Sequence, residues 1–187
     1  QYPVAALYRR KAKKRRDAIL QFMWDEEAGF FFDWHAQKNS HTEIWSLAGV
    51  FPLYCGLASH EQAAKVAHAI EAKFLKAGGV LTTLHETGQQ WDAPNGWAPL
   101  QWVTIVGLRR YGFDVLADTI KYRWLATNEA VYANQHKFVE KYNVVDTAEL
   151  DGGGEYTVQD GFGWTNGVFM ALRHDDDKKI AKKVPTP

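Results

Sequence analysis

The chain has 187 residues, of which 46% are hydrophobic and 14% aromatic, and 22 basic side chains balance 22 acidic ones. This composition excludes an intrinsically disordered chain, and the zero net charge gives no reason to expect a nucleic acid or a membrane surface as partner. The length is sufficient for one domain with a hydrophobic core. The single cysteine, Cys55, excludes an intrachain disulfide, and its apolar surroundings in sequence predict an inert core residue.

Helical periodicity dominates the first 80 residues. Apolar residues recur at helical spacing over 4–24, and the basic middle of this stretch fits a solvated helix face or a contact with an acidic surface elsewhere in a larger protein. The aromatic-rich stretch 27–39 is typical of a loop, and 43–57 of a buried helix. A Ser-x-x-Gln capping box at 59–62 starts a further helix, which ends at the two glycines 78–79.

The rest of the chain alternates helices with long loops. The expected helices and irregular segments are, in chain order, a loop over 80–99, helices near 99–111 and 113–134, a loop over 137–167 and a last helix over 168–173. No strand-rich block interrupts this pattern, so the sequence predicts an all-α fold. Long loops on a helical scaffold are usually functional.

Two tryptophan-rich runs lie in these loops. Gln90–Trp102 reads Gln-Trp-Asp-Ala-Pro-Asn-Gly-Trp-Ala-Pro-Leu-Gln-Trp, and Asp151–Gly167 reads Asp-Gly-Gly-Gly-Glu-Tyr-Thr-Val-Gln-Asp-Gly-Phe-Gly-Trp-Thr-Asn-Gly. Flat apolar rings stack on the faces of sugars, while carboxylates and amides bind hydroxyl groups. Because each run combines these groups with glycines, the two runs predict the wall of a site for a polyhydroxylated ligand.

The first run fits the pattern Gln-Trp-Asp-x-Pro-x-Gly-Trp-x-Pro, which resembles the trehalase family of glycoside hydrolases. The second run resembles the glycine-rich loop near the C-terminus of the same family. The resemblance implies an (α/α)6 toroid of six helical hairpins, of which residues 1–174 supply about half, followed by a charged tail, 175–187, that we expect to fray. It also implies inverting hydrolysis of α,α-trehalose to two glucose molecules by two carboxyl groups, with no cofactor.

Glu140 is the residue to which the resemblance assigns the role of general base. It lies in Phe-Val-Glu-Lys-Tyr, upstream of Gly-Glu-Tyr, as does the base in the family. From the residues alone, Glu140 also fits a solvated carboxylate paired with a neighbouring lysine. Glu155 follows three glycines, which let a backbone approach a ligand closely. The resemblance makes Glu155 a substrate-binding acid and the second candidate for the base, and a surface turn is its alternative.

The remaining candidates for substrate binding are rings, amides and one carboxylate in the two runs. The candidate sugar platforms are Trp91, Trp97, Tyr156, Phe162 and Trp164, and the candidate hydroxyl ligands are Gln90, Asp92 and Gln159. Any one of these rings more often packs than binds, although as a set in loops they favour binding, and a buried amide also holds loops together. Asp92 precedes Pro-Asn-Gly, so capping of a turn and contact with a ligand are equal alternatives.

The family's general acid is missing from this sequence. The upstream family segments with Pro-Gly-Gly-Arg and Gly-Trp-Asp-Phe-Ser cores are not found, and the second of these carries the acid. We therefore expect an N-terminal part of the same enzyme as a partner, as another segment or a separate chain, with trehalose as the substrate. The seven histidines are scattered, with no His-Glu-x-x-His pair, so we expect no metal site.

Two other functions fit the same residues. One is a non-catalytic sugar-binding module, and the other is an (α/α) glycosidase that acts on a different glucoside. For the compartment, the polar tail that ends in proline favours the periplasm, whereas the lack of disulfides also fits the cytoplasm.

Overall fold

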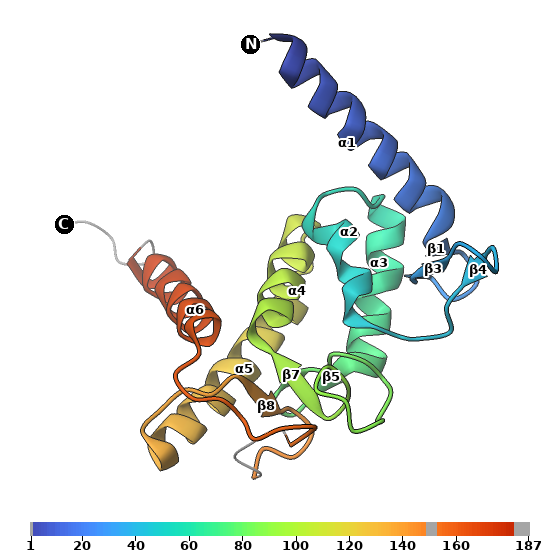
Figure 1. Cartoon of the computed structure of the whole chain (residues 1–187). Coiled ribbons are helices and arrows are strands. Elements are labelled where there is room, and N and C mark those ends of the chain that lie inside the picture. The colour runs from blue at the N-terminus through green and yellow to red at the C-terminus, as the bar shows by residue number, and fades with distance from the viewer. Residues whose placement is uncertain (1, 149–152, 182–187) are drawn as a thin grey trace.

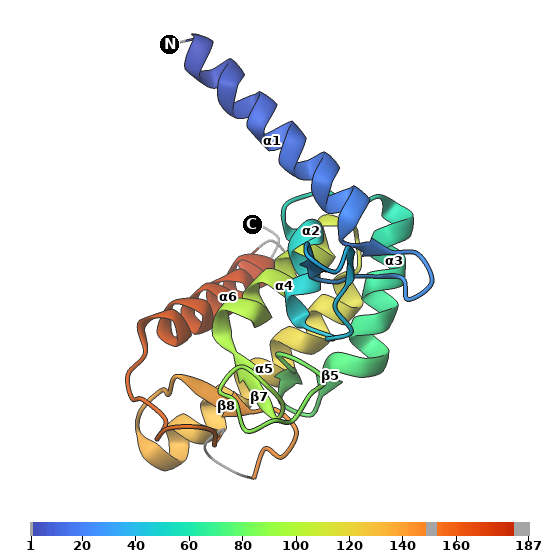
Figure 2. The same cartoon turned by 45° about the vertical axis from the view of Figure 1, so that its right-hand side comes forward.

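A long helix projects from the body of the molecule at its N-terminal end (Figures 1 and 2). The structure, a computed structural model, describes residues 2–148 and 153–181, with side chains over 3–148 and 153–175. Helix α1, Tyr2–Phe22, is rich in alanine, lysine and arginine, which are strong helix formers, and confirms the helix expected near 4–24. Residues 3–18 are exposed, so the basic run is solvated within the described part of the chain.

The aromatic stretch after α1 folds into two small hairpins rather than an irregular loop. Strand β1, Trp24–Asp25, pairs with β2, Phe30–Phe31, and β3, Trp34–His35, pairs with β4, Ser40–His41. Phe30 and Phe31 of the first hairpin are buried and pack in the hydrophobic core. The hairpins therefore attach the foot of α1 to the helical body.

The prediction of a buried helix over 43–57 is wrong. Only a 3-10 turn, η1 at Leu47–Val50, and one α-helical turn, α2 at Phe51–Tyr54, are helical. The segment before them is extended because its backbone bonds to the stretch after β6, with Leu47 N–H donating to Thr82 O and Leu84 N–H to Trp45 O. Cys55 is a correction too: it follows the short α2 and is exposed instead of lying in the core.

The capping box is confirmed. Ser59 Oγ accepts from the Gln62 N–H, and Gln62 Oε1 accepts from the Ser59 N–H, at the start of α3, His60–Ala69. One π-helical turn, η2 at Ile70–Phe74, continues α3 into a hairpin of β5, Leu75–Lys76, and β6, Gly79–Val80. The helical segment therefore ends at Phe74, about one turn before the predicted end at the two glycines 78–79.

Three longer helices complete the body. They are α4, Ala98–Arg110, α5, Asp114–Gln135, and α6, Gly163–Ala181. Helix α4 packs between α2, α5 and α6, and its Ile105 and Leu108 are fully buried in the main core. Pro99 lies in the first turn of α4, as expected. Helix α6 begins earlier and ends later than the 168–173 prediction, so its backbone continues into the stretch expected to fray.

Parts of two predictions lie outside the described residues, namely Asp151 and Gly152 of the second run and 182–187 of the tail. Within the described residues, no helix combines the length and the apolar character that crossing a membrane requires.

Candidate active site

A three-residue ladder brings the two tryptophan-rich runs together. Strand β7, Asn95–Trp97, pairs antiparallel with β8, Lys141–Asn143, with Gly96 opposite Tyr142. Figures 1 and 2 show the pair at the end of the body remote from α1. Gly96 is required there, because a Cβ atom on it would lie 2.4 Å from Val144 Cγ1. The ladder places the first run beside the segment that carries Glu140.

Three of the predicted indoles form one cluster. The rings of Trp91 and Trp97 stack with centroids 3.8 Å apart and planes 5° apart, and Trp164 meets both edge-on at 6.1 and 5.7 Å. Trp97 is 1% exposed and its Nε1 donates to Gln90 O, so Trp97 packs inside the protein. Trp91 is 44% exposed and offers a ring face near the surface. Phe162 packs on Trp164 at 4.7 Å.

Gln90 presents a buried amide to the glycine-rich loop. Its side chain is almost fully enclosed, and neither Oε1 nor Nε2 has a hydrogen-bond partner among the described residues. The backbone of Gly154 passes close to it with φ +119°, and a Cβ on Gly154 would lie 2.8 Å from Gln90 Oε1. Glycine is therefore favoured at 154 for its backbone conformation, and the Gln90 amide beside it is buried with its hydrogen-bonding capacity unused among the described residues.

Glu140 lies immediately before β8 and is 5% exposed. Its Oε1 accepts a hydrogen bond from the Tyr156 hydroxyl at 3.1 Å, while Oε2 is buried and has no partner among the described residues. The backbone is held on both sides: Glu140 N–H donates to Gln159 O at 2.9 Å, and Trp164 Nε1 donates to Glu140 O at 3.4 Å. The solvated carboxylate paired with a lysine, the alternative interpretation, does not describe this geometry.

Tyr156 contacts both Glu140 and Lys141. Lys141 Nζ is 4.7 Å from the centroid of the Tyr156 ring and 6.0 Å from that of Trp97, and the Lys141 side chain is fully buried. Loss of hydration raises the pKa of the Tyr156 hydroxyl, and the hydrogen bond to Glu140 and the charges of Glu140 and Glu155 raise it further. The phenol is therefore kept protonated, and it remains a donor to the Glu140 carboxylate.

The other predicted residues differ in their surroundings. Asp92 braces its own loop, since Oδ1 accepts from Thr83 Oγ1 at 2.8 Å and Oδ2 accepts from Thr87 Oγ1. Gln159 is exposed, and its side chain donates to Thr157 O while its backbone carbonyl holds Glu140. Glu155 is exposed at the loop surface. The Asp92 carboxylate therefore bonds to two threonines of its loop and does not cap the Pro-Asn-Gly turn, and its contact with a ligand stays a prediction.

Two residues of the site carry no signal in the sequence. Thr165 Oγ1 donates to Val139 O at 2.8 Å and is buried at the start of α6, and Lys141 reads as a solvated charge. Only the three-dimensional pairing of β7 with β8 places Lys141 under the aromatic rings. Among the residues described, His, Cys, Asp and Glu side chains nowhere gather into a group of three able to hold a metal ion.

The chain is similar in sequence and fold to known glycoside hydrolases. The family model for trehalases matches residues 3–174. Neutral trehalase from Saccharomyces cerevisiae is similar at a TM-score of 0.75 and 31% identity, over 90% of this chain and 30% of that chain. The GH63 mannosylglycerate hydrolase from Thermus thermophilus, solved in complex with glucose, is similar at a TM-score of 0.62 and 28% identity, over 82% of this chain and 36% of that chain.

The chain spans about a third of the length of these two relatives. Its helices and short strands match a part of their fold, which confirms the expected class, a partial toroid of helices. Because the family model covers most of the sequence, the chain belongs to the trehalase family of glycoside hydrolases.

Proposed function

We propose that this chain is the C-terminal portion of an inverting α,α-trehalase, which splits trehalose into two glucose molecules. The observation that supports this function best is the state of Glu140. One carboxylate oxygen is held by Tyr156, and the other is buried and without a partner among the described residues. A fixed carboxylate with one free oxygen in an aromatic wall is suited to take a proton from a water molecule.

In this mechanism, Glu140 Oε2 accepts a proton from a water as the water oxygen forms a bond to the anomeric carbon. On the opposite face of the sugar, a carboxylic acid protonates the glycosidic oxygen as the bond to the leaving glucose breaks. An inverting enzyme keeps its two carboxyl groups roughly 6.5–9.5 Å apart, which leaves room for the water. The second group is the general acid, which we assign to a part of the enzyme outside this chain.

The residues around Glu140 supply the binding surface in this proposal. The exposed face of Trp91 stacks on a glucose ring, and the buried Gln90 amide takes a hydroxyl group as its missing partner. On the glycine-rich loop, the Glu155 carboxylate binds further hydroxyl groups, and the Tyr156 ring offers an apolar face to a sugar. Trp97, Phe162 and Trp164 form the packed layer behind this surface.

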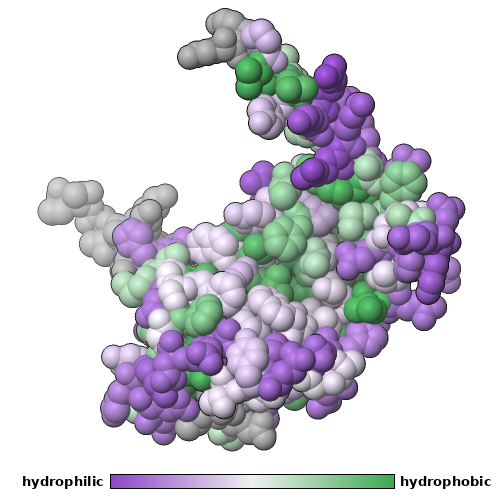
Figure 3. Space-filling view, in the orientation of Figure 1, coloured by the Kyte–Doolittle hydropathy of each residue, from purple (hydrophilic) through white to green (hydrophobic). Residues whose placement is uncertain are grey.

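We further propose that the N-terminal part of the same enzyme packs against this chain, as a segment or as a separate chain. An apolar groove of about 250 Å³ beside the foot of α1 supports this, with Ile19, Met23, Phe31, Ile44, Pro52 and Leu57 among its lining residues. Figure 3 shows hydrophobic surface at the foot of α1 and over the adjoining body. Denaturing mass spectrometry tests the partner: an active sample that contains only a 21.3 kDa species contradicts it.

Replacement of Glu140 by glutamine tests the catalytic assignment. Glutamine keeps the size of the side chain but does not act as a base, so kcat on trehalose should fall by about 10²–10⁴-fold while trehalose binding persists. The matched control is Glu71→Gln, on the exposed side of η2, which should leave both quantities unchanged. If the complete enzyme, with its N-terminal part present, binds trehalose without releasing glucose, this chain acts as a sugar-binding module instead.

Another glycoside, such as a different glucoside or a mannoside, is the second candidate substrate, because one structural relative is a mannosylglycerate hydrolase. A substrate profile separates the two: the proposal requires trehalose to have the highest kcat/KM. We also propose the periplasm as the compartment, on the polar, proline-ending tail alone, with the cytoplasm as the alternative. Cell fractionation with activity assays decides between them.

A further inference from the structure

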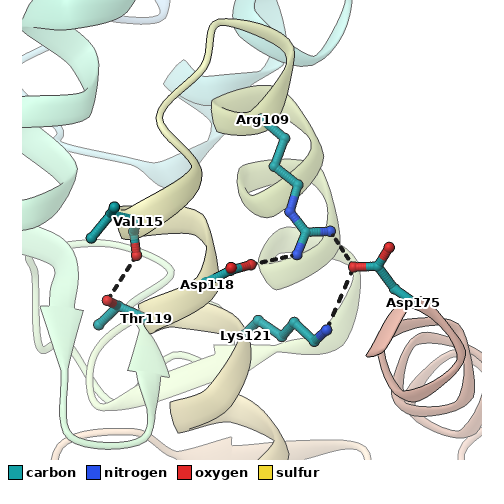
Figure 4. Close-up of polar contacts among 6 residues, drawn as sticks. All are labelled: Arg109, Val115, Asp118, Thr119, Lys121 and Asp175. Carbon is teal, nitrogen blue, oxygen red and sulfur yellow. Dashed lines mark hydrogen bonds and ion pairs between the residues drawn. The ribbon is translucent and has the colours of Figure 1, made fainter. Parts of the chain in front are cut away.

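A cluster of four charged side chains joins α6 to α4 and α5 (Figure 4). Arg109 on α4 donates from Nη1 to Asp175 Oδ2 at 2.7 Å and from Nη2 to Asp118 Oδ1 at 2.6 Å. Lys121 Nζ on α5 lies 3.5 Å from the same Asp175 oxygen. Two cations and two anions thus balance, and Asp175 is the member that belongs to α6.

The cluster is partly withdrawn from water. The Lys121 side chain is fully buried, and those of Arg109, Asp118 and Asp175 are 22%, 32% and 35% exposed. Partial burial lowers the pKa of Arg109, but the hydrogen bonds to Asp118 and Asp175 outweigh it and leave that pKa raised. Paired charges in such a site fix geometry more firmly than surface pairs, because replacing one partner leaves the other incompletely solvated.

The other end of α6 touches the segment that carries Glu140 at three points. The Phe169 ring packs on Phe138 with centroids 4.8 Å apart, Thr165 Oγ1 donates to Val139 O, and Trp164 Nε1 donates to Glu140 O. Asp175 lies ten residues beyond Thr165, which is about 15 Å along a helix. A rigid helix therefore connects the charged cluster to the backbone of the proposed base.

We propose that Asp175 and Arg109 are positioning residues for Glu140, acting through α6. They set where α6 lies against α4 and α5, and α6 in turn sets the backbone on which Glu140 stands. This inference rests on the proposed function for its effect on rate, whereas its structural part is independent of any substrate. Neither residue touches the sugar-binding surface described above.

Amide hydrogen exchange on this chain tests the structural part. In Asp175→Asn, the amides of Glu140 and of β8 should exchange about tenfold faster under native conditions, since the segment opens locally more often. The matched control is His174→Gln, which changes an exposed side chain of α6 next to Asp175. The control should leave these amides within twofold of wild type. Faster exchange confined to α6, or equal in both variants, would overturn the proposal.

Kinetics on the complete enzyme test the catalytic part. Asp175→Asn should lower kcat about tenfold and change KM less than twofold. Thr165→Val should lower kcat through the same helix. The fold-loss of kcat in the double variant should therefore be smaller than the product of the two single losses. A fully multiplicative loss contradicts the coupling. If Asp175→Asn does not fold, Arg109→Lys keeps the charge but removes the two-pronged contact and serves in its place. A wild-type enzyme that is inactive on trehalose refutes the proposed function and leaves the exchange result standing.

Discussion

The Tyr156 hydroxyl donates a hydrogen bond to Glu140 Oε1 at 3.1 Å, and this contact joins the glycine-rich loop to the proposed base. In sequence, Glu140 precedes and Tyr156 follows the stretch 149–152, which lies outside the described residues. Since Oε1 is occupied by Tyr156, Oε2 is the oxygen left to meet a water. Tyr156 was predicted from sequence as a sugar platform, and the geometry adds a contact with Glu140 that the sequence does not reveal.

Replacing Tyr156 by phenylalanine should lower kcat on trehalose by about tenfold, because a lost hydrogen bond to a charged group costs about 1.5–3 kcal/mol and frees the carboxylate to rotate. The phenyl ring keeps the apolar contacts, so KM should change far less. Steady-state kinetics measures both. Tyr132→Phe, at an exposed position of α5, is the control and should match wild type. Equal kcat values for Tyr156→Phe and wild type contradict the positioning of Glu140 by Tyr156.

Replacing Gln90 by an apolar residue should weaken trehalose binding without lowering the stability of the protein. Its buried amide has no partner in the ligand-free protein among the described residues, so Gln90→Met should leave the free energy of unfolding unchanged or raise it by about 1 kcal/mol, while trehalose binding weakens about tenfold. Urea denaturation and calorimetric titration provide the two readouts.

Gln101 is the matched control for Gln90. Its buried amide is satisfied, because Nε2 donates to Val80 O at 2.7 Å and Oε1 accepts from the Val80 N–H at 3.0 Å. Gln101→Met should therefore destabilise the protein by about 2 kcal/mol. A comparable loss of stability in Gln90→Met would show that the Gln90 amide is part of the fold rather than a site for a ligand.

Gly96→Ala should destabilise the chain by about 1–3 kcal/mol, because the added methyl group overlaps Val144 inside the β7–β8 ladder. Gly167→Ala, on α6, is the control: its Cβ meets nothing within 4 Å, and alanine favours a helix by about 1 kcal/mol over glycine. Denaturant midpoints of the two variants should move in opposite directions. Equal midpoints would place Gly96 outside the tight contact.

Ionisation of Tyr142 should lower the free energy of unfolding at alkaline pH. Burial raises the pKa of its hydroxyl to about 12, although the hydrogen bond from the Val139 N–H partly lowers that pKa. Because the folded pKa lies above the unfolded value, the folded state holds its proton longer. The corresponding stability is complete below about pH 10 and is lost as the pH rises through 12, by about 3 kcal/mol in total.

Urea denaturation from about pH 8 to about pH 11.5, a range that spans the ordinary tyrosine pKa, measures this loss. Tyr142→Phe cannot ionise, so its stability should fall less steeply with pH than that of wild type, which isolates Tyr142 from the other tyrosines. Parallel curves for the two proteins would mean that Tyr142 does not contribute.

The helix starts were predictable because their signals are local. The Ser59–Gln62 capping box and the proline in the first turn of α4 act within one turn of the chain, and both predictions are confirmed. The stretch 43–57 was misread because its apolar composition suits a helix, whereas backbone bonds to the distant 82–84 segment hold its first part extended. Local composition carries no trace of such a distant backbone partner.

The site was only partly predictable. The two runs mark where Trp91, Gln90 and Tyr156 lie, but strands of three residues carry no periodic signal, so the β7–β8 pairing was invisible. Arg109 and Asp175, 66 positions apart in sequence, read as separate solvated charges on two helices until the fold brings them together. The roles of the predicted sugar-binding residues remain predictions.

Proton NMR of trehalose, mixed with the complete enzyme that contains this chain and the part with the general acid, and followed at the earliest times, tests the central claim most directly. Inversion releases one glucose with a β anomeric centre and one with α, so the account predicts equal α- and β-glucose signals before mutarotation, and their loss in Glu140→Gln. Release of α-glucose alone, or undiminished release by Glu140→Gln, would contradict it.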